Sequence, residues 1–251
     1  MYDRSPHPGA PGDEAAAMNS RFVAVARDPR LIPGVHHYCD EWCHYCPVTR
    51  RCLAFRCIAE YRKQRGLADS DPTFNSMAEA IALTREIAAV EGASTADLDA
   101  LTGKAPGADA MHTQDALAGL ALEYAFAVTT ILKPTAAEVS YWGAPAAAPE
   151  PREVVLWYHL RIYMKLVRAL VGKERTAAGE VERSEDAAGC AKLTLVSIAR
   201  SREALRALDT PAFHAGVTTL LGLLDAIEGG IDERFPDARG FVRVGLDVPA
   251  A

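Results

Sequence analysis

The sequence lacks long runs of apolar residues, and it has no excess of positive charge. No apolar stretch among its 251 residues approaches the ~20 that a membrane helix needs, so we expect no membrane partner. Acidic residues outnumber basic ones by 33 to 27, and the formal net charge of −6 argues against a general nucleic-acid binder. Hydrophobic residues still make up 49% of the chain, which is enough for a globular core.

The start of the chain lacks the basic region and apolar core of a signal peptide. We interpret residues 1–20 as a flexible polar lead-in and expect a cytoplasmic protein. Cysteines in a reducing compartment seldom form disulfides, so a cluster of cysteines there indicates a metal site.

The sequence shows no βαβ alternation, no phosphate-binding loop, no nucleophile elbow and no metalloprotease motif. Apolar residues instead recur at helical spacing, with glycines such as Gly172, Gly229 and Gly230 as expected helix ends. This pattern predicts helices over residues 48–65, 76–91, 113–133, 153–171 and 184–208, and a last one that opens at Thr210 and Pro211. A proline-rich connection spans 134–152, and alternating valines at 242–248 follow a strand period.

We therefore predict an all-α protein, in which a helical bundle carries an N-terminal cysteine-rich metal-binding segment. The expected parts are the lead-in at 1–20, the cysteine-rich module with a basic helix at 21–66, the bundle at 67–231 and an extended tail at 232–251.

Five of the six cysteines fall between Cys39 and Cys57. The spacing Cys39-x3-Cys43-x2-Cys46-x5-Cys52 predicts one metal centre, because soft thiolates select zinc, copper(I) and iron–sulfur clusters. Zinc sites usually use two short pairs separated by a longer stretch, whereas three cysteines within eight residues are similar to ferredoxin runs, so the spacing favours iron–sulfur. Zinc stays open as the alternative, because His36, His37 or His44 could replace a cysteine.

Positive charge follows the cysteines. Arg50 and Arg51 adjoin Cys52, and a helix that begins near Pro47 would add its partial positive end to a negative thiolate site. The same arginines are also compatible with a plain solvated face. Cys57, five residues after Cys52, is expected to be a small buried side chain, and Cys190 a core residue.

The stretch Cys43-His44-Tyr45-Cys46-Pro47-Val48-Thr49-Arg50-Arg51-Cys52-Leu53 resembles the core of the WhiB-like iron–sulfur proteins, which have a Cys-x2-Cys-Pro-Val-x3-Cys-Leu element and one more cysteine upstream. The resemblance implies a [4Fe–4S] cluster on Cys39, Cys43, Cys46 and Cys52. It covers about a dozen residues. The family's Gly-Val-Trp-Gly-Gly turn and basic tail are absent, so DNA binding is not implied.

Cys39-x3-Cys43-x2-Cys46 is also similar to the pattern of radical SAM enzymes. Those enzymes need an α/β barrel, and this chain lacks the strands for one. We therefore set that interpretation aside.

Three polar residues could form a site within the bundle. His159 lies on an apolar stripe, Glu123 is expected on the inner side of another helix, and Asp186 lies at the start of a third. They are the candidate catalytic residues, although a lone histidine on such a stripe is more often a core residue. Arg161, Lys165 and Arg168 form a basic strip that could bind an anion or pair with acids.

We expect an iron–sulfur protein with a redox, sensing or assembly role and a protein or redox partner. The first alternative is a zinc-stabilised helical interaction protein. The second is an enzyme with its site at His159, Glu123 and Asp186.

Overall fold

The computed structural model describes residues 24–25, 27–64, 115–134, 148–177 and 184–248. The lead-in at 1–20, the expected helix at 76–91 and most of the connection at 134–152 lie outside these residues. Contacts divide the chain into two units, the first within Met1–Pro33 and Val48–Ala105 and the second within Gly34–Pro47 and Pro106–Ala251.

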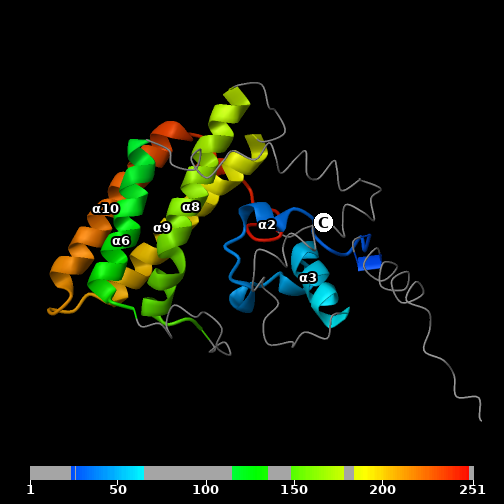
Figure 1. The fold of residues 1–251 in the computed structure, drawn as a ribbon, viewed down its shortest axis with the longest axis horizontal. Helices are drawn as coiled ribbons and strands as arrows, with labels where there is room; N and C mark the ends of the chain where they lie inside the picture. The colour runs from blue at the N-terminus through cyan, green and yellow to red at the C-terminus, as the bar shows by residue number, and fades with distance from the viewer. Residues whose placement is uncertain (1–23, 26, 65–114, 135–147, 178–183, 249–251) are drawn as a thin grey trace, which may run out of the picture. The chain divides into compact units, whose positions relative to one another are not determined.

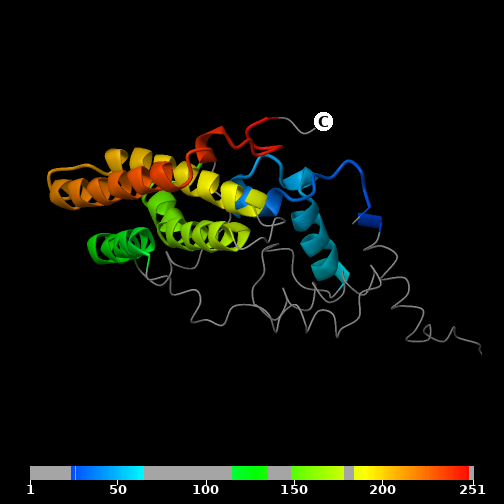
Figure 2. The same cartoon turned by 90° about the horizontal axis from the view of Figure 1, so that it is seen from above.

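Every regular element of the described residues is a helix, as the sequence predicts. The second unit contains α6 (Ala116–Leu132), α8 (Pro151–Ala177), α9 (Ser184–Ala207) and α10 (His214–Arg234), which run side by side in Figures 1 and 2. α8 packs on α9 and α6, and α10 packs on α6 and α9, so the four helices surround one core. None of the described helices is both long and apolar enough to cross a membrane.

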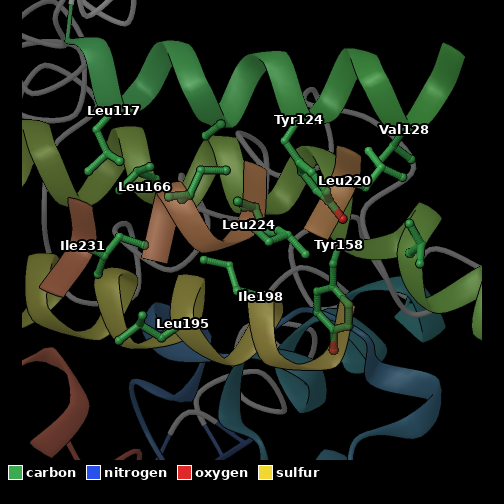
Figure 3. Packing of buried hydrophobic residues seen from close by; sticks show 14 of the residues in the cluster. Leu117, Tyr124, Val128, Tyr158, Leu166, Leu195, Ile198, Leu220, Leu224 and Ile231 are labelled. Carbon is green, nitrogen blue, oxygen red and sulfur yellow. The ribbon is translucent and has the colours of Figure 1, made fainter. Parts of the chain in front are cut away.

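The core of this bundle consists of apolar side chains from all four helices. Figure 3 shows Tyr124 of α6, Leu166 of α8, Ile198 of α9 and Leu224 of α10 pointing toward one another, and all four are fully buried. These residues fall on the helical stripes of the sequence, because burial of the apolar face drives their association.

Residues next to the helices explain where α6 begins and ends. Asp115 caps α6, because its carboxylate accepts a hydrogen bond from the backbone N–H of Leu117 at 2.8 Å. α6 ends at Lys133, which has a left-handed φ of 48° and stands before Pro134. α9 covers Ser184–Ala207 and confirms the helix predicted at 184–208.

The expectation that glycines end the helices is wrong for α8 and α10. α8 continues past Gly172 to Ala177, and α10 passes through Gly229 and Gly230 to Arg234. A Cβ at Gly172 would lie 2.8 Å from the Cβ of Ala187 on α9. This glycine therefore permits a close approach of two helices and does not stop one.

The first unit is built around α3 (Leu53–Gln64) and the 3₁₀ turn η2 (Thr49–Arg51). The backbone of Ile32 pairs with this segment: its N–H donates to the Arg51 carbonyl at 2.7 Å, and its carbonyl accepts from the Leu53 N–H at 3.2 Å. The helix therefore begins five residues later than predicted. Cys57 and Tyr61 form a small apolar cluster of this unit.

The residues that alternate at 242–248 form a closed turn, and this part of the expected extended tail is therefore not extended. After the 3₁₀ turn η5 (Ala238–Gly240), the N–H of Gly245 donates to the Val248 carbonyl at 2.7 Å, and Gly245 has a φ of 86°. The guanidinium of Arg243 pairs with the Asp247 carboxylate at 2.7 Å and locks the turn. The described residues contain no strand with which this segment could pair, and hydrogen bonds within the turn engage its backbone instead.

Candidate metal centre

Three of the four predicted cysteine ligands lie on one short loop of the second unit, residues 39–46, which we call the cysteine loop. Cys39 follows α2 (Val35–Tyr38), Cys43 begins the 3₁₀ turn η1 (Cys43–Tyr45), and Cys46 ends it. The N–H of Cys46 donates to the Cys43 carbonyl at 3.3 Å. Cys39 is buried, and Cys43 and Cys46 are half-buried. Each of the three residues borders a helical turn of the loop.

Cys52, the fourth predicted ligand, belongs to the first unit. It ends η2, and its carbonyl accepts from the Arg56 N–H at 3.0 Å, so it is the residue that opens α3. The positive end of the helix is therefore at Cys52 and not near Pro47 as predicted. Arg50, Arg51 and Arg56 are exposed beside it.

All six cysteines are free thiols. Among the residues that the structure describes, no three His, Cys, Asp or Glu side chains come together as a metal-binding group. Burial raises the pKa of Cys39 to about 12, although the backbone N–H of Glu41 and the charge of Lys165 act in the other direction. Cys39 without a metal is therefore a neutral thiol, and a metal would have to displace its proton.

The donor set nevertheless suits a soft metal. Four thiols within fourteen residues supply sulfur alone, and His44, between two of them, carries a buried Nε2 with no hydrogen-bond partner among the described residues. A buried imidazole nitrogen without a partner is uncommon in a folded protein. This nitrogen is the one that would serve as a ligand in the zinc alternative.

Asp40 fastens the cysteine loop to the bundle. Its Oδ2 accepts hydrogen bonds from the Tyr158 hydroxyl of α8 at 2.6 Å and from Arg200 Nη1 of α9 at 2.5 Å. Its backbone carbonyl accepts from Trp157 Nε1 at 3.2 Å and from Arg161 Nε at 3.0 Å. Two helices thus hold the residue that follows Cys39.

Glu41 adds a second fastening. Its carboxylate lies 2.8 Å from Lys165 Nζ and 3.9 Å from Arg161 Nη2. Burial opposes ionisation, but the charges of Lys165 and Arg161 prevail and lower the pKa of Glu41. Arg161 and Lys165 therefore pair with an acid, which is one of the two interpretations of the basic strip. The other was that it binds an anion.

Trp42 is the apolar anchor of the loop and is only 5% exposed. Its ring stacks on Trp157 with a centroid distance of 4.9 Å and an interplanar angle of 12°, and it meets Tyr45 and Tyr158 edge-on at 4.8 and 5.7 Å. Such pairs favour one geometry beyond simple burial. The aromatic contacts therefore fix the backbone between Cys39 and Cys43.

Sequence reasoning missed this anchor. The sequence gives little sign of the roles of Asp40, Glu41 and Trp42, because their partners in the bundle lie 115 to 160 residues away in the chain. The sequence did contain a signal. Two acids and a tryptophan lie within the cysteine run, and α8 carries a tryptophan and two basic residues that could pair with them.

Glu123 does not contribute to the predicted site within the bundle. Glu123 is exposed on α6, so the expectation that it lies on the inner side is wrong. His159 is buried, and its Nδ1 lies 2.6 Å from the Leu156 carbonyl one turn earlier, as for a core histidine. Asp186 begins α9, and its side chain lies outside what the structure describes.

Cys57 and Cys190 are both buried in apolar surroundings, as predicted. Burial, with a smaller contribution from Cys52, raises the pKa of the Cys57 thiol to about 11.

The chain matches no protein-family model, and no curated protein or solved structure is detectably similar to it.

Proposed function

We propose that Cys39, Cys43, Cys46 and Cys52 bind a [4Fe–4S] cluster, and that the protein has a redox, sensing or assembly role with a protein or redox partner. The observation that carries this proposal is the way the bundle holds the cysteine loop. A loop whose acid and tryptophan are tied to α8 and α9 keeps its thiols in place without metal. Such support lowers the ordering cost of ligand binding.

Local charge supports the same proposal. Two carboxylates, Asp40 and Glu41, face three cations, Arg161, Lys165 and Arg200, which leaves one excess positive charge beside the loop. Four thiolates on an iron–sulfur core leave a negative site, so this excess is of the right sign. The start of α3 at Cys52 contributes in the same direction.

Cys52 is near enough along the chain to complete the set. Six residue steps separate it from Cys46, and an extended chain covers at most about 3.6 Å per residue, or about 22 Å in all. A bound cluster would supply one-electron transfer, and the chain's own part is to hold four sulfurs and limit solvent at Cys39 and Cys52.

Structural zinc is the second candidate, and His44 is the observation that favours it. Its buried Nε2 has no partner among the described residues, and zinc accepts mixed sulfur and nitrogen ligands. The protein would then be a zinc-stabilised helical interaction protein.

Substitution of single cysteines tests the ligand set. We expect Cys46→Ser to lose most of the bound metal after anaerobic purification, whereas Cys57→Ser and Cys190→Ser keep the wild-type amount. His44→Ala separates the candidates, since it would lower zinc content and spare iron. A Cys46→Ser protein with full metal content would refute the proposal for both metals.

A further inference from the structure

The described part of the first unit is strongly basic, although the whole chain is acidic. Residues 24–25, 27–33 and 48–64 contain seven basic and two acidic side chains, a formal charge of +5, whereas the full chain has −6. The two acids, Asp28 and Glu60, are half-buried, and six of the seven basic side chains are exposed. The acidic net charge of the chain therefore conceals a region of the opposite sign.

The fold gathers part of this positive charge in one place. The backbone pairing of Ile32 brings the segment that carries Arg30 beside the start of α3, where Arg51 Nε donates to the Arg30 carbonyl at 3.4 Å. Arg30 pairs with Asp28 at 2.7 Å. Hydrogen bonds from Arg30 lower the pKa of Asp28 to about 2, and the charge of Arg56 acts in the same direction. Three arginines from two segments therefore lie near a single carboxylate.

The same charge adjoins a predicted cluster ligand. Arg50 and Arg51 directly precede Cys52, and the N–H of Arg56 donates to the Cys52 carbonyl at 3.0 Å. All three arginines are exposed, and none has an ion-pair partner among the described residues. Together with Arg30 they form what we call the basic surface. Its charge is available to a partner that approaches Cys52.

The make-up of the basic surface indicates the kind of partner. In the described part of the first unit no large apolar side chain is exposed, and those that the structure shows, such as Phe126 and Met164, lie in the second unit. Stable protein interfaces depend on apolar anchors, whereas electron-transfer complexes are small, weak and steered by charge. Nucleic acid also attracts arginines, but the position of this charge around Cys52 favours a redox partner.

We propose that the basic surface docks an acidic electron-transfer protein of the ferredoxin or flavodoxin type, which exchanges one electron with the cluster held in part by Cys52. In either direction one protein is oxidised and the other reduced, and no bond or proton is transferred. This inference rests on the proposed iron–sulfur function and names the kind of partner that the site would serve.

The test begins with calorimetric titration of the anaerobically purified full chain with two acidic carriers, a plant-type ferredoxin and a flavodoxin. We expect at least one carrier to bind at about 20 mM salt, and to bind at least about tenfold more weakly at about 300 mM, because salt screens exposed charges. Stopped-flow mixing of one reduced and one oxidised protein, in both combinations, should then show electron exchange with the same dependence on salt.

Variants of the basic surface separate docking from a general effect of charge. Arg56→Glu reverses one charge and should weaken binding of the carrier at least about fivefold at low salt. Arg50→Glu should act in the same direction, and it serves if thermal melting shows that Arg56→Glu does not fold. Arg206→Glu changes an exposed arginine of α9 in the second unit and should leave binding within about twofold of the wild type.

Metal analysis of the same preparation reports separately on the proposed function. The docking alone is refuted if a chain with its cluster binds neither carrier, exchanges no electron with a bound carrier, or binds equally well as the Arg56→Glu and Arg206→Glu variants. Tighter binding to a short DNA duplex or to anionic lipid vesicles than to the carriers also overturns it. A chain that holds no cluster refutes the proposed function, and this inference with it.

Discussion

Asp40 joins the cysteine loop to the bundle, because both its side chain and its backbone carbonyl accept hydrogen bonds from bundle helices. Its carboxylate is 15% exposed, and its side chain and carbonyl accept from groups on both α8 and α9. A buried donor that loses its acceptor costs more than an average hydrogen bond contributes. The stability of the second unit therefore depends on this residue.

We predict that Asp40→Ala lowers the free energy of unfolding by about 2–5 kcal/mol, because Tyr158 and Arg200 lose a shared acceptor in a partly buried place. Urea unfolding followed by circular dichroism measures the change. Asp209→Ala removes an exposed acid that pairs with His214, and it should change stability by no more than about 0.5 kcal/mol. Equal effects of the two variants would contradict the role given to Asp40.

His159 yields a pH prediction at the same scale. Burial lowers the pKa of His159, the Leu156 carbonyl partly offsets this, and the charge of Arg161 lowers it further. The unfolded chain then binds a proton at about pH 6.5, whereas the folded chain binds one only at lower pH. The free energy of unfolding should therefore fall as the pH drops below about 6.5.

The His159→Phe variant tests this assignment, because phenylalanine has a similar size and does not titrate. Its stability should vary less between pH 6.5 and 5 than that of the wild type, as measured by urea unfolding at each pH. His214→Phe changes an exposed histidine and is the matched control. An unchanged pH dependence in His159→Phe would show that another group is responsible.

At the scale of elements, the bundle depends on close approach where glycines face a neighbouring helix. Gly172 on α8 faces Ala187 on α9, and backbone atoms of Ala187 lie within 3.7 Å of the position a Cβ would take. Backbone cannot move aside as a flexible side chain can. The two helices would have to separate to admit a methyl group.

We predict that Gly172→Ala destabilises the protein by about 1–3 kcal/mol, despite the higher helix propensity of alanine. Gly222→Ala on α10, where a Cβ meets nothing within 4 Å, should instead stabilise it by about 0.5–1 kcal/mol. Thermal unfolding of the two variants measures both changes. A stabilised Gly172→Ala protein would mean that α8 and α9 are less closely packed than described.

The sequence predicted elements well where local signals agree. α9 was placed within a residue because Ser184 and Glu185 suit a helix start and an apolar stripe follows. The prediction that Gly172 and Gly230 end their helices was wrong, because the role of a glycine depends on which residue of another helix lies opposite. The anchor at Asp40 and Trp42 was missed for the same reason, because their partners are remote in sequence.

At the scale of the molecule, the two units divide the predicted ligands, with Cys39, Cys43 and Cys46 in one and Cys52 in the other. A metal held by the proposed ligands would bind the folded chain in preference to the unfolded one, so its removal should lower the melting temperature. The identity of the metal is thus the property on which the account depends most.

Anaerobic purification with metal and sulfide analysis and an absorption spectrum tests this claim most directly. The account predicts a brown protein with about four iron and about four sulfide per chain and broad absorption in the near-ultraviolet and blue. A colourless protein that contains stoichiometric zinc, or no metal, would contradict it.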